Sequence, residues 1–165
     1  DGDDIRALIP GYTGKNSYLF QGAISIIVDR IQDYALKQRQ TFVLDGTLSD
    51  YGKTVKNIRR SLDKHRTVFI FYVYQKPEVA WRFTQAREDA EGRHIPKAAF
   101  IEGFLGARNT VDQVRKELGK EVVVSLVKKD FEKHTVENVV DIKQGQSVDD
   151  YITERYTREE LEKRL

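Results

Sequence analysis

The chain alternates between segments whose apolar residues have helical spacing and segments where they run together. Residues 15–38 carry apolar side chains around much of a helix, which predicts a long and well-buried helix. Residues 50–63 and 97–118 show the narrower stripe of an amphipathic helix. The apolar positions of the first segment are Leu19, Phe20, Ala23, Ile24, Ile27 and Ile31.

Two continuous apolar runs predict buried strands. Residues 67–74 read TVFIFYVY, which is nearly all β-branched or aromatic, and residues 41–44 read TFVL before a turn. Because these runs are continuous rather than alternating, we expect both faces of each strand to be buried, as in a parallel sheet. Further strands are expected at residues 121–127 and 136–142.

The remaining segments complete an alternation of helices and strands. Pro77 suits the first turn of a helix, Gly92 suits its end, and residues 153–165 predict a charged terminal helix. The alternation predicts an α/β fold with a parallel sheet and helices on both faces. Ligands of such sheets bind beyond the carboxyl ends of the strands. We expect one domain over residues 1–165.

Composition narrows the functional classes. The 165 residues have a net charge of +2, so nothing favours a nucleic-acid partner. The absence of cysteine excludes disulfides and thiolate metal sites, and the histidines have no ligand-like spacing. No apolar run approaches the roughly 18 residues of a membrane span, and no export feature is present. We therefore expect a cytoplasmic protein with no membrane partner.

Acidic residues crowd the start of the chain, at Asp1, Asp3 and Asp4. Such carboxylates repel one another unless a cation lies nearby, and a Mg²⁺–phosphate complex is one such partner, with Asp1 as a candidate ligand. A carboxylate beside a phosphoryl group can also accept the proton of an attacking hydroxyl. The alternative is a solvated acidic loop.

Two further carboxylates, Asp45 and Asp29, occupy positions where a ligand could bind. Asp45-Gly46-Thr47 directly follows the predicted strand 41–44, at the expected ligand edge, and Gly46 allows close backbone approach. The alternative is a turn followed by a helix cap from Ser49 or Asp50. Asp29 lies in an otherwise apolar helix and needs a partner, such as Arg30 or a hydroxyl-rich ligand.

Three arginines, Arg82, Arg87 and Arg93, lie in a polar stretch before Pro96. Phosphoryl transfer needs cations that neutralise the transferring group, and an arginine-bearing lid at about residues 82–97 would supply them. The alternative is a solvated face with an ion pair between Arg87 and Glu91.

Residues 11–17, GYTGKNS, only faintly resemble a phosphate loop. The Walker A pattern needs a glycine where Ile9 stands and Ser or Thr where Asn16 stands. No apolar strand leads into this loop. We therefore reject it as a nucleotide site, although Lys15 could still contact phosphate.

Three motifs in order resemble the zeta-toxin family: DGDDIRALIPGY, FVLDGTLSDY and YVYQKPEVAWRFTQAREDAEGRHIPKAAF. The resemblance covers roughly residues 1–105. That family is the toxin half of bacterial toxin–antitoxin pairs, with related chromosomal kinases. The resemblance implies a P-loop kinase-like fold that uses ATP and Mg²⁺ to phosphorylate the 3′-hydroxyl of UDP-N-acetylglucosamine, and an antitoxin partner, either separate or fused.

The resemblance also implies roles for individual residues. Asp3 matches the general base of the family's Asp-x-Asp motif. Asp45-Gly46-Thr47 matches an acidic-Gly-Thr triplet that holds substrate, with Asp45 in place of Glu, and Asp29 matches an acidic substrate contact. Arg93 matches one of two phosphate-clamping arginines. The other is Arg87 or Arg82, and we prefer Arg87.

The family's Walker A loop precedes its Asp-x-Asp motif, whereas nothing here precedes Asp1. We therefore expect the N-terminal strand and phosphate loop to lie outside this chain, which alone would be inactive. Two other readings stay open. One is another small-molecule or polynucleotide kinase of the same fold, and the other is a non-catalytic module that binds a nucleotide or a protein.

Overall fold

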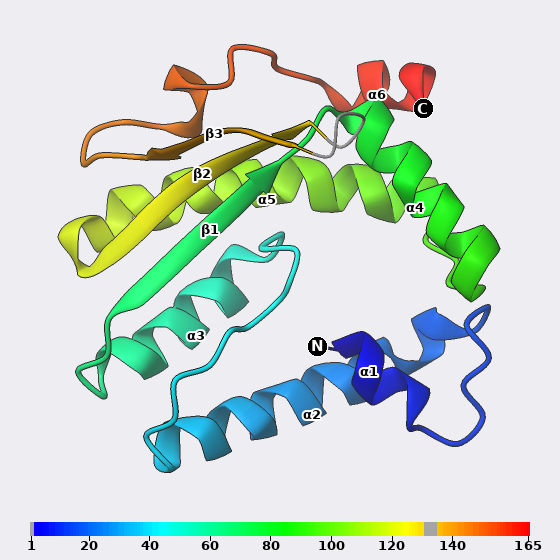
Figure 1. Ribbon diagram of the computed structural model, residues 1–165, viewed down its shortest axis with the longest axis horizontal. Helices are drawn as coiled ribbons and strands as arrows, with labels where there is room; N and C mark the ends of the chain where they lie inside the picture. The colour runs from blue at the N-terminus through cyan, green and yellow to red at the C-terminus, as the bar shows by residue number, and fades with distance from the viewer. Residues whose placement is uncertain (1, 131–134) are drawn as a thin grey trace. The chain divides into compact units, whose positions relative to one another are not determined.

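The computed structural model describes residues 2–130 and 135–165, which form helices and three strands (Figure 1). The helices are α1 (Gly2–Ala7), α2 (Ser17–Lys37), α3 (Tyr51–Leu62), α4 (Pro77–Glu91), α5 (Lys97–Leu118) and α6 (Arg158–Arg164). The strands are β1 (Val68–Tyr74), β2 (Val122–Asp130) and β3 (Thr135–Asp141), and short 3-10 turns are η1 (Gly119–Glu121) and η2 (Val148–Asp150).

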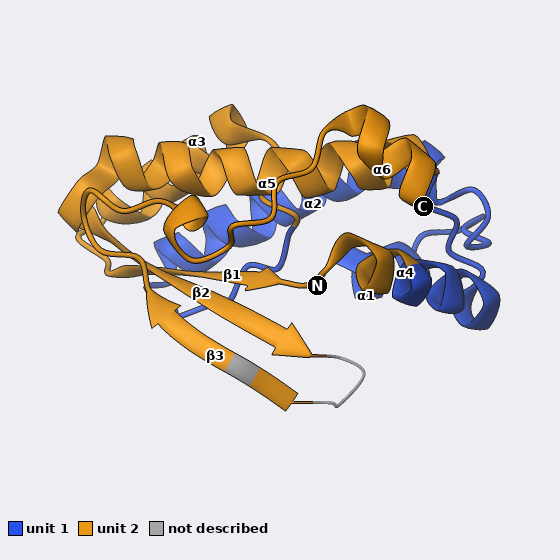
Figure 2. Ribbon diagram, turned by 90° about the horizontal axis from the view of Figure 1, so that it is seen from above, with its two compact units in different colours: residues 1–46, 82–96 blue, residues 47–81, 97–165 orange. Residues whose placement is uncertain are grey.

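The chain divides into two compact units, coloured separately in Figure 2. Unit 1 contains residues 1–46 and 82–96, and unit 2 contains residues 47–81 and 97–165. Helix α4 is continuous across the boundary between Trp81 and Arg82. The prediction that residues 1–165 form one domain stays a prediction.

Unit 2 is built on a sheet with the strand order β1-β2-β3. Strand β1 pairs in parallel with β2, from Val68 opposite Val122 to Tyr74 opposite Lys128, and α4 and α5 form the crossover between them. This pairing confirms the α/β class. Strand β3 instead pairs antiparallel with β2, because only residues 131–134 separate the two strands and a parallel crossover needs about a dozen residues.

The core of unit 2 lies between the sheet and the helices α3 and α5, and α5 lies along β2 (Figure 1). Side chains along β1 alternate, with Ile70 and Tyr72 buried and Phe69 and Phe71 60% and 61% exposed. The prediction that both faces of residues 67–74 are buried is therefore wrong for the described chain. Helices of unit 2 cover one face, and the two-residue period of a strand places every second side chain on the other.

The predicted strand at residues 41–44 does not form. Val43 is 95% exposed there, and the pairing of the described strands involves only β1, β2 and β3. A short apolar run has no stability of its own as a strand, because its backbone groups need a neighbouring strand to pair with. The candidate triplet Asp45-Gly46-Thr47 therefore follows an irregular segment.

Unit 1 contains α2, which begins and ends within a few residues of the predicted helix, and α1, which packs against it. A Cβ atom on Gly2 of α1 would lie 3.2 Å from Ile24 Cγ2, so the two helices approach closely there. Ile24 is buried, but Leu19 and Ile31 are 66% and 51% exposed. The prediction of a well-buried helix therefore holds at Ile24 but is wrong at Leu19 and Ile31, because the six-residue helix α1 is too short to cover the 21 residues of α2.

Capping residues, proline and glycine mark where helices α4 and α6 begin or end. Helix α4 begins at Pro77 as predicted, and Gly92 follows it with a φ of 71°. Helix α6 begins only at Arg158, later than predicted, because Thr157 and Glu160 form a capping box there. No described helix has the length and apolarity that crossing a membrane requires.

Candidate functional site

Three arginines converge on the carboxylate of Asp3 within unit 1. Arg87 on α4 donates from Nη2 to Asp3 Oδ2 at 3.2 Å, and Arg93, just after α4, donates from Nη1 to the same oxygen. Arg6, one turn along α1, donates from Nη1 to Asp3 Oδ1. The structure thus brings together three residues that the sequence predicts, Asp3, Arg87 and Arg93, across 84 and 90 positions of the chain.

A close backbone contact holds the segment after α4 in place. Gly14 is buried with a φ of 77°, and a Cβ atom there would lie 2.8 Å from the carbonyl oxygen of Gly92. The Ser17 hydroxyl donates to the carbonyl oxygen of His94 at 3.2 Å. Residues 11–17 therefore position the segment that carries Arg93.

The two predicted clamps differ in their surroundings. The Arg93 side chain is 22% exposed, whereas that of Arg87 is 51% exposed. Arg87 Nη2 also donates to Glu91 Oε2 at 3.3 Å, and this bond, with a smaller contribution from Asp3, raises the pKa of Arg87. Both guanidiniums line a shallow hollow with Thr84 and Ile95. Two guanidinium groups on one hollow are suited to binding phosphoryl oxygens.

The third member of the cluster, Arg6, is absent from the predicted site. Its side chain is only 5% exposed, and its Nη2 donates to Gln21 Oε1 of α2 at 2.7 Å. The i, i+3 spacing from Asp3 on one helix was the available signal. That spacing alone does not distinguish a buried partner from a solvated surface pair.

The structure also locates the predicted substrate contacts. Asp29 lies half-buried on α2, eight residues and so about 12 Å along the helix axis from Gln21. Asp45 is exposed near the end of the first segment of unit 1. The Thr47 hydroxyl lies 2.9 Å from that of Ser49 in unit 2. That these residues join Asp3 around one substrate stays a prediction.

Metal binding was predicted at Asp1, which lies outside the described residues. Within the described ranges, no group of three or more histidine, cysteine, aspartate or glutamate side chains could hold a metal ion. Both oxygens of Asp3 accept hydrogen bonds from guanidiniums. The described residues therefore do not fit a Mg²⁺ site by themselves.

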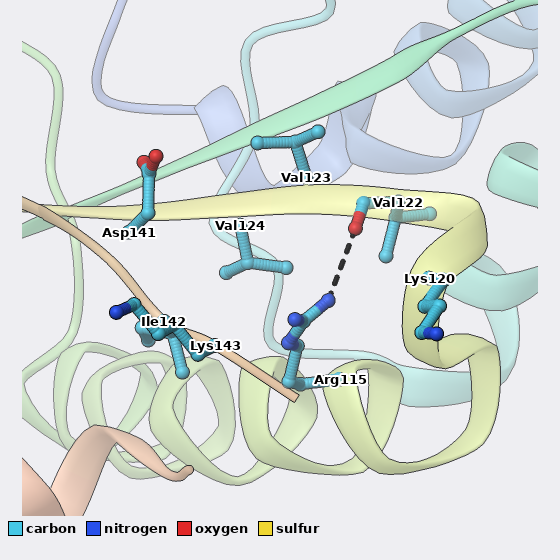
Figure 3. A pocket seen from close by; sticks show the side chains of 8 residues that line it. All are labelled: Arg115, Lys120, Val122, Val123, Val124, Asp141, Ile142 and Lys143. Carbon is cyan, nitrogen blue, oxygen red and sulfur yellow. Dashed lines mark hydrogen bonds between the residues drawn. The ribbon is translucent and has the colours of Figure 1, made fainter. Parts of the chain in front are cut away.

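A second pocket, of about 250 Å³, lies in unit 2 beside the start of β2 (Figure 3). Arg115 reaches into it from α5 and donates from Nη1 to the Val122 carbonyl oxygen at 3.1 Å, while Asp141 accepts a hydrogen bond from Ser125 at 2.5 Å. Arg115 thus caps main-chain groups at the turn into β2. This pocket is also at the amino end of the strand, whereas ligands of parallel sheets bind beyond the carboxyl ends.

Comparison with known proteins gave one match. The family model described as Zeta toxin matches residues 1–147 of the chain. Neither a curated protein nor a solved structure shows a significant match. The matched region contains Asp3, Arg87 and Arg93, and it extends beyond the roughly 105 residues over which the motifs are recognisable.

Proposed function

Because the chain belongs to the zeta toxin family, we propose that it transfers the γ-phosphoryl group of ATP to the 3′-hydroxyl of UDP-N-acetylglucosamine. Membership in this family implies kinase activity in general. The observation that supports a phosphoryl-transfer site in this chain is the cluster in which Arg87 and Arg93 both contact Asp3. A candidate base and two candidate phosphate clamps thus lie within hydrogen-bonding distance of one another.

In the proposed reaction, Asp3 accepts the proton of the acceptor hydroxyl as its oxygen attacks the γ-phosphorus. The new bond joins that oxygen to phosphorus, the bond from phosphorus to the β–γ bridging oxygen breaks, and ADP leaves. Arg87 and Arg93 neutralise the charge that spreads over the phosphoryl oxygens during transfer.

The observed contacts imply a change of partners during this reaction. Arg87 and Arg93 contact Oδ2 of the Asp3 carboxylate, the group that also has to receive the proton. A phosphoryl group that binds the two guanidiniums would replace this carboxylate as their partner. We propose that the segment at about residues 82–97 acts as a lid, which carries both arginines onto the phosphoryl group.

The proposal also assigns roles to groups outside this cluster. Asp29, Asp45 and Thr47 would contact hydroxyl groups of the sugar nucleotide. When bound, Mg²⁺ would neutralise charge on the ATP phosphates, but the described residues do not fit a Mg²⁺ site and we assign no step to it. An antitoxin, as a separate protein or a fused segment, and a cytoplasmic location belong to the same proposal.

The test is an assay of the full-length gene product with ATP and UDP-N-acetylglucosamine, in which ³¹P NMR identifies the phosphorylated position. Asp3→Asn should lower kcat by about 100-fold or more, because general-base catalysis contributes that much. Asp4→Asn is the matched control, since Asp4 is exposed on the same helix. Full turnover in Asp3→Asn would exclude Asp3 as the base. Activity on nucleic-acid ends without activity on sugar nucleotides would overturn the proposed acceptor.

A further inference from the structure

The geometry points to Arg6 as a positioning residue that holds the base Asp3 in a fixed orientation during phosphoryl transfer. This inference rests on the proposed function, because it takes Asp3 as the base. Arg6 would act through Asp3 and would contact neither the phosphoryl group nor the acceptor.

The three arginines contact different oxygens of the Asp3 carboxylate. Arg87 and Arg93 both contact Oδ2, whereas Arg6 contacts Oδ1. A phosphoryl group that binds Arg87 and Arg93 would therefore draw both guanidiniums away from Oδ2 and leave Oδ1 bonded to Arg6. This asymmetry assigns proton acceptance to Oδ2 and orientation to Oδ1.

Arg6 has a fixed position that the two clamps lack. Its side chain is 5% exposed, against 22% for Arg93 and 51% for Arg87. Its guanidinium donates two hydrogen bonds, one from Nη1 to Asp3 and one from Nη2 to Gln21 Oε1 at 2.7 Å. Because Gln21 belongs to α2, this guanidinium links the base-bearing helix α1 to the longer helix of unit 1.

The burial of Arg6 is not well explained by stability. Its Nε is buried and has no hydrogen-bond partner among the described residues. Burying a charged group whose hydrogen-bonding capacity is incompletely used costs free energy, and buried ion pairs often contribute little net stability. Such a cost is more typical of functional sites, where a charged group has to be held at a defined position.

Two variants distinguish a role of Arg6 in orienting Asp3 from a role in folding. Both are assayed in the full-length protein with ATP and UDP-N-acetylglucosamine. Arg6→Lys keeps the charge but loses the planar fork, so that one nitrogen cannot hold both Asp3 and Gln21. Gln21→Ala removes only the second anchor, at an exposed position of α2. Matched controls are Arg30→Lys and Gln85→Ala, which are the same substitutions at exposed positions of α2 and α4.

We expect Arg6→Lys to lower kcat by about 10- to 100-fold and Gln21→Ala to lower it by about 3- to 10-fold. Losses of this size follow because misplacing a reacting group by 1 Å can lower the rate by about 100-fold. The KM for the acceptor should stay within about 2-fold of the wild-type value, since Arg6 does not contact the acceptor. Values of kcat are referred to folded protein, counted by the stoichiometry of inorganic phosphate binding. A purely structural role would instead lower the folded fraction and leave the kcat of the folded protein unchanged. That result, in an enzyme whose wild type turns over, would overturn the inference and leave the proposed function standing.

If the wild type does not phosphorylate the sugar nucleotide, the proposed function fails and a second measurement decides on Arg6. In ¹⁵N-labelled protein, the guanidinium resonances of Arg6 should show slow exchange with water and slow rotation. Asp3→Asn should make both fast, and Asp4→Asn should change neither. A guanidinium that is already fast in the wild type would show that Arg6 does not hold Asp3.

Discussion

The guanidinium of Arg87 donates a hydrogen bond to the carboxylate of Asp3 at 3.2 Å, although 84 positions separate the two residues. Arg93 donates to the same oxygen. A phosphoryl group and the Asp3 carboxylate are both anionic partners for these guanidiniums. The candidate base therefore competes with phosphate for the candidate clamps, and this competition can be measured without turnover.

Asp3→Asn should strengthen the binding of inorganic phosphate. Removing the carboxylate charge frees Arg87 and Arg93 and also removes its repulsion of the anion. We expect an increase in affinity of about 3- to 10-fold by calorimetry, where each tenfold is about 1.4 kcal/mol. Asp4→Asn, which changes the same charge at an exposed position of α1, should have a smaller effect. An unchanged or lower affinity in Asp3→Asn would show that the arginines bind phosphate elsewhere or not at all.

Arg93→Ala should impair turnover more than Arg87→Ala. Arg93 is the less exposed of the two, and Arg87 also pairs with Glu91. We expect kcat to fall by about 100-fold or more for Arg93→Ala, because the loss of one group that stabilises transition-state charge costs about 100- to 1000-fold. For Arg87→Ala we expect a smaller fall, of about 10-fold, because solvent screens its more exposed charge.

Arg82→Ala tests the other candidate for the second clamp. Arg82 lies five residues before Arg87 on α4, which is about 140° around the helix axis. We expect its kcat to stay within about 3-fold of wild type, as for a residue outside the site. A larger loss for Arg82→Ala than for Arg87→Ala would reverse the assignment.

Gly14→Ala should destabilise unit 1 more than Gly11→Ala. Both glycines have a left-handed φ, 77° and 84°, so both substitutions carry a similar backbone cost. Only at Gly14 would the added Cβ also meet backbone, 2.8 Å from the Gly92 oxygen, whereas Gly11 has nothing within 4 Å. We expect losses in the free energy of unfolding of about 1 kcal/mol for Gly11→Ala and at least about 2 kcal/mol for Gly14→Ala, measured by urea unfolding. Equal losses would mean that Gly92 can move away freely.

Tyr72→Phe should make unit 2 less sensitive to alkaline pH. Burial raises the pKa of Tyr72 from 10.0 to about 12. Between these pH values the folded state keeps a proton that the unfolded state releases, so stability falls as pH rises. Tyr72 should account for about 2 to 3 kcal/mol of the loss in unfolding free energy by pH 12, at 1.36 kcal/mol for each pKa unit. Urea unfolding between pH 9 and pH 12 would test this, and parallel curves for wild type and Tyr72→Phe would contradict it.

The local sequence was sufficient to locate most elements of this fold. The periodicity of residues 15–38, 50–63 and 97–118 located α2, α3 and α5 to within a few residues, because each helix follows from side chains close together in the chain. Pro77 and Gly92 marked the ends of α4. The capping box of Thr157 and Glu160 was also readable, and it would have placed the start of α6 correctly.

The sequence also selected the polar residues that carry the candidate chemistry. Asp3, Arg87 and Arg93 were predicted from their types, their motifs and a family resemblance, and they meet in unit 1. Arg6 was missed, because a charged residue three positions from an aspartate has the same pattern whether it is buried or solvated. Only its contact with Gln21 on another helix shows that it is held inside.

What the sequence by itself determined was therefore the type of each element and the residues able to do phosphoryl chemistry. Only the tertiary structure decided which apolar surfaces are covered and which polar groups meet. Residues 41–44 read as a strand but lack a pairing partner, and β1 reads as buried on both faces although helices cover one. Both outcomes depend on neighbours distant in the chain, since a strand needs another strand for its hydrogen bonds and a side chain needs a packed surface for its burial.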